Sequence, residues 1–576
     1  MFLKTKIDEM IELIGKKKKM NLGEISKKLK WEPGSVEKIA IVLDKKGLLK
    51  THYPLTMIGK PWIELTGEEK VEEEKIPQEK AIEKYQVKSR DQIIADVKIY
   101  ESKDDKRPRY FVSLPQISRY TRAYFEYVKD EISRDLPFTA EEKTRAELSK
   151  AVEERRAAIL KKITKDLKPD EKTAGLLTQV LLNDMYGLGN LEVLVSDIML
   201  EEIAVNTSKV PVAVYHRKHG WMKTNIVLKN EEDIQNYASQ IARKVGRQVN
   251  ILSPLLDAHL ITGDRVNATY YPISTSGNTI TLRLFARTPW TVVSFLKKEN
   301  NSFSAEMAAL LWQAVHYEMN VLVAGGTASG KTSALNAIAA LIPPYQRIVT
   351  IEDTREMMLP VYQWNWVPLV TREANPEGLG EVTMLDLVVN SLRMRPDRIV
   401  MGEIRRKEEA EVLFEAMHTG HSVYATIHAD TGSQTMKRLT EPPIEVPESE
   451  VVDIDLLLVQ YRNRRLNVRR TLELSEVSEG PSGLELKRLY VYKPRKDTFE
   501  ALNPPRRYIE RLNLHTGMTE KEIKEDQKGK ADVLKWLVDK DFSTIDQVGG
   551  IMKAYYANED EVVKAANKKI DPKKFI

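Results

Sequence analysis

The fold of this chain is decided by the stretch Gly325-Gly-Thr-Ala-Ser-Gly-Lys-Thr332. It matches the phosphate-binding pattern G-x-x-x-x-G-K-[ST] at every fixed position. The apolar run Val321–Ala324 precedes it, and the helix-forming run Ser333–Leu341 follows it. A strand, a glycine-rich loop and a helix in this order predict backbone N–H groups gathered around phosphate oxygens at a helix N-terminus. We therefore predict that the chain binds a nucleoside triphosphate.

The side chains of this loop have separate expected roles. Lys331 is expected to reach the β- and γ-phosphates, and Thr332 is expected to hold Mg²⁺. The cofactors predicted from the loop are therefore ATP and Mg²⁺. The residues expected to contact ATP are Gly325, Gly326, Thr327, Ala328, Ser329, Gly330, Lys331, Thr332 and Ser333.

The composition limits the class of protein. The chain has 576 residues, of which 42% are hydrophobic and 30% charged, and its formal net charge is +5. That length allows several domains, and so small a net charge does not indicate a global nucleic-acid-binding surface. There is no cysteine, which excludes disulfides, thiolate zinc sites and cysteine nucleophiles. No apolar segment is long enough for a transmembrane helix, so we expect a soluble, cytoplasmic protein.

Two later stretches end an apolar run with carboxylates. Arg347–Glu356 contains Glu352, and Asp397–Arg405 contains Glu403. Nucleotide sites of α/β sheets lie at the carboxyl ends of strands, where carboxylates can position Mg²⁺ or activate a water molecule. We expect both glutamates to act catalytically and to share the metal with Thr332. The sequence favours Glu403 as the base but does not separate the two.

A further stretch, Thr419–Asp430, predicts a buried strand that ends near His428. A histidine at that place can bond the γ-phosphate or the attacking water, and we expect it to be a catalytic residue. The plainer alternative is a core histidine whose ring is satisfied by the backbone. That alternative suits an isolated histidine better than one that follows three ordered motifs.

The chain divides into five expected segments. Residues 1–66 are typical of a winged-helix-like unit, with three short helices followed by a hairpin, and such units bind DNA or pack against protein. Residues 67–94 are rich in Glu and Lys and predict a charged linker. Residues 95–297 predict an α/β domain with a helical start, and 298–505 an ATPase domain. Residues 506–576 predict a helical C-terminal region, a candidate partner surface.

The four motifs in this order resemble the type II/IV secretion ATPases. This superfamily powers type II secretion, type IV pili, archaella and type IV secretion. Its Walker A, Asp, Walker B and His boxes would be Gly325–Thr332, Ile351–Glu356, Ile399–Arg405 and Gly420–His428. The stretch Trp366–Arg372 is similar to the archaeal branch in particular. The resemblance implies an α/β fold class with a RecA-like P-loop ATPase domain, a PAS-like N-terminal domain, the winged-helix-like unit and the helical C-terminal region.

The resemblance also implies that arginines of the N-terminal domain reach the phosphates. The stretches Gly263–Ala268 and Thr281–Phe285 match, so the expected residues are Arg265 and Arg283. Such an arginine can stabilise charge in the transition state. The alternative is a salt bridge on the strand surface.

Two departures from the family pattern are visible. Arg405 is followed by Arg406 and Lys407, where many members carry an acidic residue. The tetracysteine zinc module of many bacterial members is excluded by the absence of cysteine.

The function expected from these motifs and the resemblance is that of a homo-hexameric motor. It would hydrolyse ATP to ADP and phosphate and drive assembly of type IV pilus- or archaellum-like filaments, or type II-like secretion. Its partners would be a polytopic membrane platform protein and, indirectly, pilin-like subunits. The motor would be cytoplasmic and peripheral at the inner face of the cell membrane. Domain closure is expected around a linker near Arg287–Lys297.

Two alternatives stay open. The first is a DNA translocase or helicase that grips DNA through residues 1–66; nucleic acid is not expected as a partner anywhere else in the chain. The second is a winged-helix regulator that uses ATP as a switch. DNA-stimulated hydrolysis would favour the first, and slow turnover with specific DNA binding would favour the second.

Overall fold

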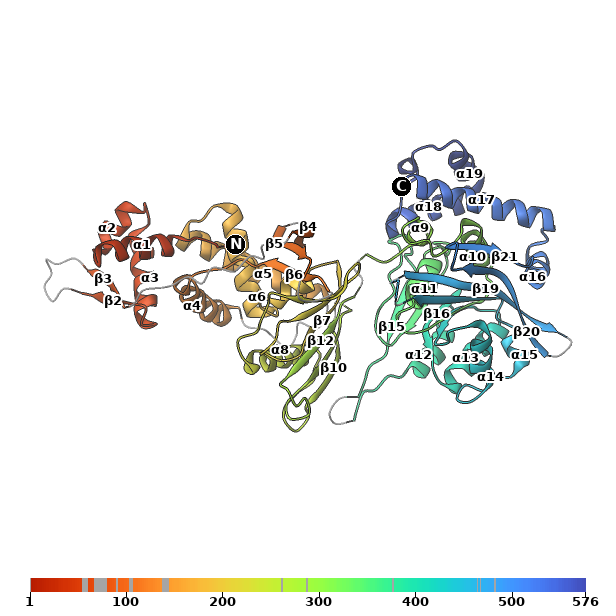
Figure 1. The fold of residues 1–576 in the computed structure, drawn as a ribbon, viewed down its shortest axis with the longest axis horizontal. Helices are drawn as coiled ribbons and strands as arrows, with labels where there is room; N and C mark the ends of the chain where they lie inside the picture. The colour runs from red at the N-terminus through yellow and green to blue at the C-terminus, as the bar shows by residue number, and fades with distance from the viewer. Residues whose placement is uncertain are drawn as a thin grey trace. The chain divides into compact units, whose positions relative to one another are not determined.

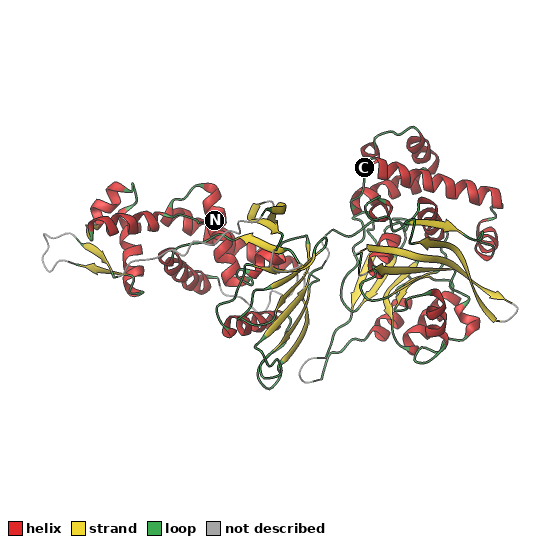
Figure 2. Ribbon diagram, in the orientation of Figure 1, coloured by secondary structure: helices red, strands yellow, loops and turns green. Residues whose placement is uncertain are grey.

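The chain folds into two compact units, Met1–Leu284 and Phe285–Ile576, each with a nine-stranded sheet (Figures 1 and 2). The structure is a computed structural model. It describes residues 2–53, 61–66, 80–89, 92–102, 107–136, 145–260, 263–285, 288–374, 378–463, 465–466, 468–480 and 483–576. Within these ranges, none of the helices combines the length and the apolar character needed to cross a membrane.

The first unit begins with a winged-helix-like element. Its helices and strands are α1 Lys6–Lys17, β1 Lys19–Asn21, α2 Leu22–Lys28, α3 Pro33–Lys45, β2 Leu49–His52 and β3 Trp62–Leu65. The predicted hairpin is the antiparallel pair of β2 and β3, and β1 adds a third strand beside β3. Side-chain caps start two of the helices, because Thr5 and Asn21 each accept a backbone N–H of the first turn.

This element does not stand apart from the chain that follows. Its apolar side chains share one core with helices α4 Arg119–Asp135, α5 Arg145–Leu167 and α6 Glu171–Tyr186. The indole Nε1 of Trp31 donates to the carbonyl oxygen of Asp166 in α5 at 2.6 Å. The winged-helix-like element therefore shares its core with the chain that follows, since Trp31 and its neighbours are buried against helices that lie about a hundred residues later.

The sheet of the first unit has the order β10-β11-β12-β7-β8-β9-β6-β5-β4, in which β4, β5 and β6 are Ala81–Ser89, Gln92–Tyr100 and Arg109–Ser113. Strands β7 to β12 are Leu200–Val205, Ala213–His216, Gly220–Thr224, Leu255–His259, Arg265–Thr269 and Thr279–Arg283, and helices α7 and α8 are Leu191–Val195 and Glu231–Lys244. The five strands β10-β11-β12-β7-β8 are antiparallel, and α8 lies on the connection from β9 to β10. This is the PAS-like part of the predicted fold. One sheet face is packed against α7 and α8, and the other carries mostly polar side chains, such as Arg265 and Asn267 on β11.

The predicted charged linker is wrong over its second half. Residues 67–79, 90 and 91 lie outside the described residues, but 81–89 and 92–94 fall within strands β4 Ala81–Ser89 and β5 Gln92–Tyr100, which continue the sheet to β6 Arg109–Ser113. The alternation of apolar and polar residues along β4 is hard to see in the sequence, because Glu83 occupies a position that faces inward. That carboxylate accepts hydrogen bonds from Lys218 Nζ at 2.9 Å and lies 2.7 Å from His219 Nε2.

The second unit is built on a mainly parallel sheet in the order β15-β14-β16-β17-β13-β18-β19-β20-β21. Strands β13 to β21 are Val321–Gly325, Ile348–Glu352, Trp366–Val370, Arg398–Ile404, Ser422–Ile427, Leu456–Asn463, Val468–Gly480, Gly483–Lys493 and Thr498–Ala501. The first six strands of this order are parallel, and the last three continue antiparallel. β13 is buried at every position, as expected for a strand covered on both faces. This arrangement is the predicted RecA-like domain.

Helices cover this sheet, and the last four of them form the C-terminal region. They are α9 Val292–Leu296, α10 Ala305–His316, α11 Lys331–Ala339, α12 Met384–Leu392, α13 Lys407–His418, α14 Gly432–Thr440, α15 Glu448–Val451, α16 Arg507–Thr516, α17 Glu520–Asp539, α18 Ile545–Ala557 and α19 Glu559–Asn567, with a final 3-10 turn at Pro572–Phe575. Side chains of α10 and of α16 to α19 belong to one core. The helical C-terminal region is therefore continuous with the ATPase domain.

The expected interdomain linker near Arg287–Lys297 is largely part of the second unit. Arg287 lies outside the described residues, but Val292, Val293 and Phe295 of α9 are buried in the core of that unit. Thr291 Oγ1 donates to the Ser543 carbonyl oxygen at 2.9 Å. The boundary between the units instead lies at Leu284 and Phe285, because the apolar residues of α9 bind the stretch that follows to the C-terminal helices.

A buried ion pair joins the C-terminal helices to α10. Lys530 of α17 is fully buried and pairs with Asp526, whose carboxylate also accepts from Gln313 Nε2 of α10 at 2.6 Å. The Lys530 ammonium lies 5.3 Å from the centre of the Tyr555 ring and 5.7 Å from that of Trp312. Burial lowers the pKa of Lys530 below its ordinary value.

We expect Lys530→Met to lower the free energy of unfolding by about 3–5 kcal/mol, because it leaves the Asp526 carboxylate buried without a counter-ion. Denaturant unfolding followed by tryptophan fluorescence measures the change. The matched control is Lys535→Met in the same helix, whose exposed pair with Glu306 is worth less than about 1 kcal/mol. Equal effects of the two substitutions would contradict the assignment.

Candidate nucleotide-binding site

The phosphate loop connects the centre of the parallel sheet to α11. β13 lies between β17 and β18 and ends at Gly325. A Cβ on Gly325 would lie 2.6 Å from the carbonyl oxygen of Gln460 on β18, so a larger residue cannot occupy this position. Gly330 has φ +99° and caps the N-terminus of α11, a left-handed conformation that favours glycine. The helix begins at Lys331, and its first N–H groups face the loop.

The structure brings the histidine of the fourth motif to the phosphate loop. His428 Nε2 lies 2.9 Å from Thr327 Oγ1, at hydrogen-bond distance. The Lys331 ammonium donates to the Gly326 carbonyl oxygen at 3.3 Å, so it lies folded over the loop. Ser329 Oγ is buried and has no hydrogen-bond partner among the described residues. Three predicted loop side chains and the predicted histidine therefore lie together.

Burial perturbs Glu352, the carboxylate at the end of β14. Its Oε1 accepts the backbone N–H groups of Glu356 at 2.9 Å and Met357 at 3.0 Å. Its Oε2 is buried and, among the described residues, has no hydrogen-bond partner. Burial is the main cause that raises the pKa of Glu352 to about 7. The carboxyl group is therefore balanced between its neutral and charged forms at neutral pH.

Glu403, the other predicted carboxylate, is in a different environment. Arg405 Nε donates to its Oε2 at 2.8 Å, and Arg405 also pairs with Asp353. Strands β14 and β16 are neighbours, and a Cβ on Gly402 would lie 3.6 Å from Glu352 Cγ. The two acidic strand ends are therefore adjacent, with Glu403 in a partly exposed ion pair and Glu352 enclosed.

The residues present fit a Mg²⁺ ion that is shared with phosphates. Among the described residues, no group of three or more histidine, aspartate or glutamate side chains is arranged to hold a metal by itself. Mg²⁺ is usually bound by one or two protein oxygens together with substrate phosphates. The half-buried Thr332 hydroxyl on the first turn of α11 and the unpartnered oxygen of Glu352 suit that role. Ser333, the last predicted contact, is exposed.

The two predicted arginines lie together on the first unit. Arg265 on β11 and Arg283 at the end of β12 are register partners on the polar face of the sheet. Arg265 makes two bonds to Asp257, from Nη2 at 2.6 Å and from Nε at 3.2 Å. The salt bridge that the sequence left as an alternative is thus present at Arg265. The phosphate loop belongs to the second unit.

One residue beside the loop was missed by the sequence analysis. Arg469 on β19 donates from Nε to the carbonyl oxygen of Ala328 at 3.0 Å. Ala328 has φ +57°, which is unfavourable for a residue with a side chain, so this bond supports a strained point of the loop. A signal exists in the sequence: Tyr461–Arg470 contains five arginines, and β18, which starts this hairpin, pairs directly with β13.

The chain is similar to several known proteins. The family model described as type II/IV secretion system protein matches residues 191–454. An uncharacterized protein of Methanocaldococcus jannaschii is 33% identical over 398 residues, which are 67% of this chain and 70% of the relative. The type IV secretion system protein PtlH of Bordetella pertussis is 29% identical over 297 residues, covering 48% of this chain and 85% of the relative.

Two solved structures are also similar. The VirB11 ATPase from the Brucella suis type IV secretion system, in complex with sulphate, matches with a TM-score of 0.26 and 24% identity over 49% of this chain and 93% of that chain. The Legionella pneumophila ATPase DotB matches with a TM-score of 0.38 and 20% identity, over 66% of this chain and 94% of that chain.

The raised pKa of Glu352 predicts a pH-dependent stability. Between pH values of about 4.5 and about 7 the unfolded chain releases this proton before the folded chain does, so the folded state loses stability as the pH rises. Glu352→Gln removes this dependence. Relative to the parent, the variant should gain about 2–3 kcal/mol between about pH 5 and about pH 8, measured by denaturant unfolding without nucleotide. The same difference at both pH values would disprove the raised pKa.

Loss of the Arg469 bond should loosen the phosphate loop. We expect Arg469→Ala to weaken binding of a fluorescent ATP analogue by about 3–10-fold, the worth of one hydrogen bond to the backbone. Arg495→Ala is the control, because Arg495 is an exposed arginine beyond β20. Unchanged affinity in Arg469→Ala would show that the contact does not shape the loop.

Proposed function

Because the chain belongs to the type II/IV secretion system protein family, we propose that it is a motor ATPase that converts ATP and water to ADP and phosphate. The proposal rests on the contact between Thr327 and His428 at the phosphate loop. A loop that only binds a nucleotide needs no histidine from another strand end. A histidine at this place can respond to the γ-phosphate and to its loss.

The binding step is assigned to the loop. Backbone N–H groups of residues 326–332 would surround the phosphates, and the Lys331 ammonium would leave the Gly326 carbonyl for the β- and γ-phosphate oxygens. Mg²⁺, when bound, neutralises charge on these phosphates. Thr332 is proposed to hold it directly, and Glu352 and the adjacent Glu403 through water molecules, so that the Glu352 carboxylate stays able to accept a proton.

The proton of the attacking water is assigned to Glu352. A general base works best when its pKa is close to the working pH, and the pKa of Glu352 is raised to about 7 by burial. Glu403 is already paired with Arg405. We therefore propose that Glu403 helps to hold the acidic ends of β14 and β16 in place and does not accept the proton. His428 would then exchange its bond to Thr327 for one to the γ-phosphate.

The coupling to motion is proposed to come from Arg265 and Arg283. Adjacent cations on an otherwise separate unit can stabilise charge on the phosphates in one nucleotide state and not in another. Arg265 would have to exchange Asp257 for phosphate. The proposed hinge lies near the division between the two units, at Leu284 and Phe285.

The oligomeric state, the location and the partners are inferred from membership of the family. We propose a homo-hexameric ring that works at the inner face of the cell membrane, with a polytopic membrane platform protein as partner and pilin-like subunits as indirect partners. The relative in Bordetella pertussis named as a type IV secretion system protein supports a role in secretion. Assembly of type IV pilus- or archaellum-like filaments is the form of this function that the archaeal resemblance favours.

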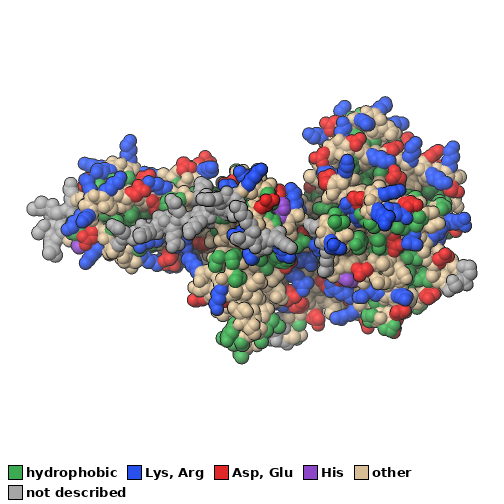
Figure 3. Space-filling view, in the orientation of Figure 1, with side chains coloured by type: hydrophobic (Ala, Val, Ile, Leu, Met, Phe, Trp, Pro, Cys, Tyr) green, Lys and Arg blue, Asp and Glu red, His purple; other side chains and the backbone are tan. Residues whose placement is uncertain are grey.

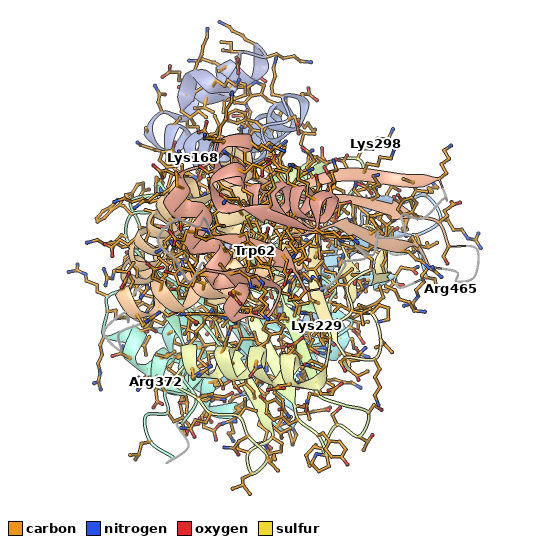
Figure 4. All side chains as sticks on the ribbon, turned by 90° about the vertical axis from the view of Figure 1, so that its left-hand side faces the viewer. Trp62, Lys168, Lys229, Lys298, Arg372 and Arg465 are labelled. Atoms are coloured by element: carbon orange, nitrogen blue, oxygen red, sulfur yellow. The ribbon has the colours of Figure 1, made fainter. Side chains whose placement is uncertain are left out.

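We expect Lys331→Ala to reduce ATP hydrolysis to background, because the ammonium that meets the transferred phosphate is lost. Phosphate release by the purified full chain, with and without vesicles, measures it. Lys298→Ala, an exposed lysine of the same unit (Figure 4), should hydrolyse ATP like the parent. Full activity in Lys331→Ala would rule out this site.

A further inference from the structure

Positive charge is concentrated at the N-terminal end of the chain. Residues 2–53 contain thirteen lysines, seven acidic residues and no arginine, whereas the whole chain carries a net charge of only +5. Seven of these lysines are exposed around the ends of α1 and α2, and Figure 3 shows blue, basic side chains on this part of the surface, with red, acidic ones among them. We call this surface the lysine face: Lys16, Lys17, Lys18, Lys19, Lys27, Lys28 and Lys30.

The local fold brings these lysines into one patch. α1 and α2 both end in lysines, which suits the negative end of a helix dipole. Glu24 of α2 accepts from Lys17 Nζ at 2.7 Å and lies 3.5 Å from Lys28 Nζ. This carboxylate therefore joins the two helix ends and neutralises only part of their charge.

The patch is flanked by an aromatic pair on the wing. Trp62 of β3, labelled in Figure 4, stacks on His52 of β2 with ring centres 3.8 Å apart. Lys19 Nζ lies 4.7 Å from the centre of the Trp62 ring. Tryptophan beside lysine is typical of protein surfaces at the boundary between lipid headgroups and water. The lysine face thus continues into a partly apolar rim.

The helix that would read DNA is used for packing. In a winged-helix fold this is α3. Lys38 of α3 bonds Asp166 of α5 at 2.5 Å and lies 5.2 Å from the Tyr127 ring centre of α4. The exposed face that remains on α3 is formed by residues on successive turns of the helix, which are Gly34, Glu37, Ile41 and Lys45. That face carries no net charge, and a DNA-reading surface needs cations for the phosphates.

We propose that the lysine face docks on the anionic headgroups of a lipid membrane. Lysine ammonium groups are flexible point charges that suit a fluid anionic surface, whereas arginine, the preferred residue for bidentate nucleic-acid recognition, is missing from residues 2–53. Clusters of four to eight basic residues are the size that binds acidic lipids. The winged-helix-like element is therefore a membrane-docking module, a role independent of the hydrolysis proposed above.

The test is co-sedimentation of the full chain with two kinds of vesicle, one of phosphatidylcholine alone and one that also contains phosphatidylglycerol. We expect binding only to the second kind, and weaker binding as salt rises. The combined substitution of Lys16, Lys18, Lys27 and Lys30 by Gln should weaken this binding at least about tenfold, since each lysine near the surface contributes roughly fivefold. ATP hydrolysis and the circular dichroism spectrum should stay unchanged.

The control is Gln at four exposed lysines of the C-terminal helical region, Lys528, Lys540, Lys568 and Lys573, which should bind vesicles like the parent. The proposal is overturned by unchanged vesicle binding of the first variant, by equal loss in the control, or by binding to phosphatidylcholine alone. Tight binding to a double-stranded DNA fragment that disappears in the first variant, without lipid binding, would make this surface a nucleic-acid site instead.

Discussion

The candidate site of the second unit depends on one constraint, that parallel strands end at the same edge of a sheet. β13, β14, β16 and β17 are neighbours in a single parallel sheet, so their carboxyl ends meet although they lie about a hundred residues apart in the chain. The phosphate loop, the two glutamates and the histidine each lie at the carboxyl end of one of these strands. Their common site follows from the strand order β14-β16-β17-β13.

The same constraint explains which parts were predictable. A buried parallel strand is a short apolar run, and a glycine-rich or acidic residue after it is visible in the sequence. The loop at Gly325–Thr332 and the motifs ending in Glu352, Glu403 and His428 were therefore identified in order. The alternating strand β4 was not, because Glu83 and its neighbours resemble a charged linker until Lys218 and His219 are seen beside them.

Other features need the three-dimensional environment. The sequence treats Glu352 and Glu403 alike, whereas burial separates them into a carboxyl with a pKa of about 7 and a partner of Arg405. Arg469 lies about 140 residues after the loop that it supports, and no local pattern links the two. The winged-helix-like element was recognised by its order of elements, but its core with α4 to α6 was not foreseen.

The placement of α10 has a mechanical consequence. It lies between the parallel sheet and the C-terminal helices, and Gln313 on it bonds both Asp526 and the backbone of Ile523 on α17. On the sheet side, the buried Arg398 of β16 donates to the Val315 carbonyl oxygen of the same helix. A pull on the outer helices is therefore carried through α10 to the strand that bears Glu403. The C-terminal helices are therefore bonded to the parallel sheet through α10, and not only through the chain that leads to them.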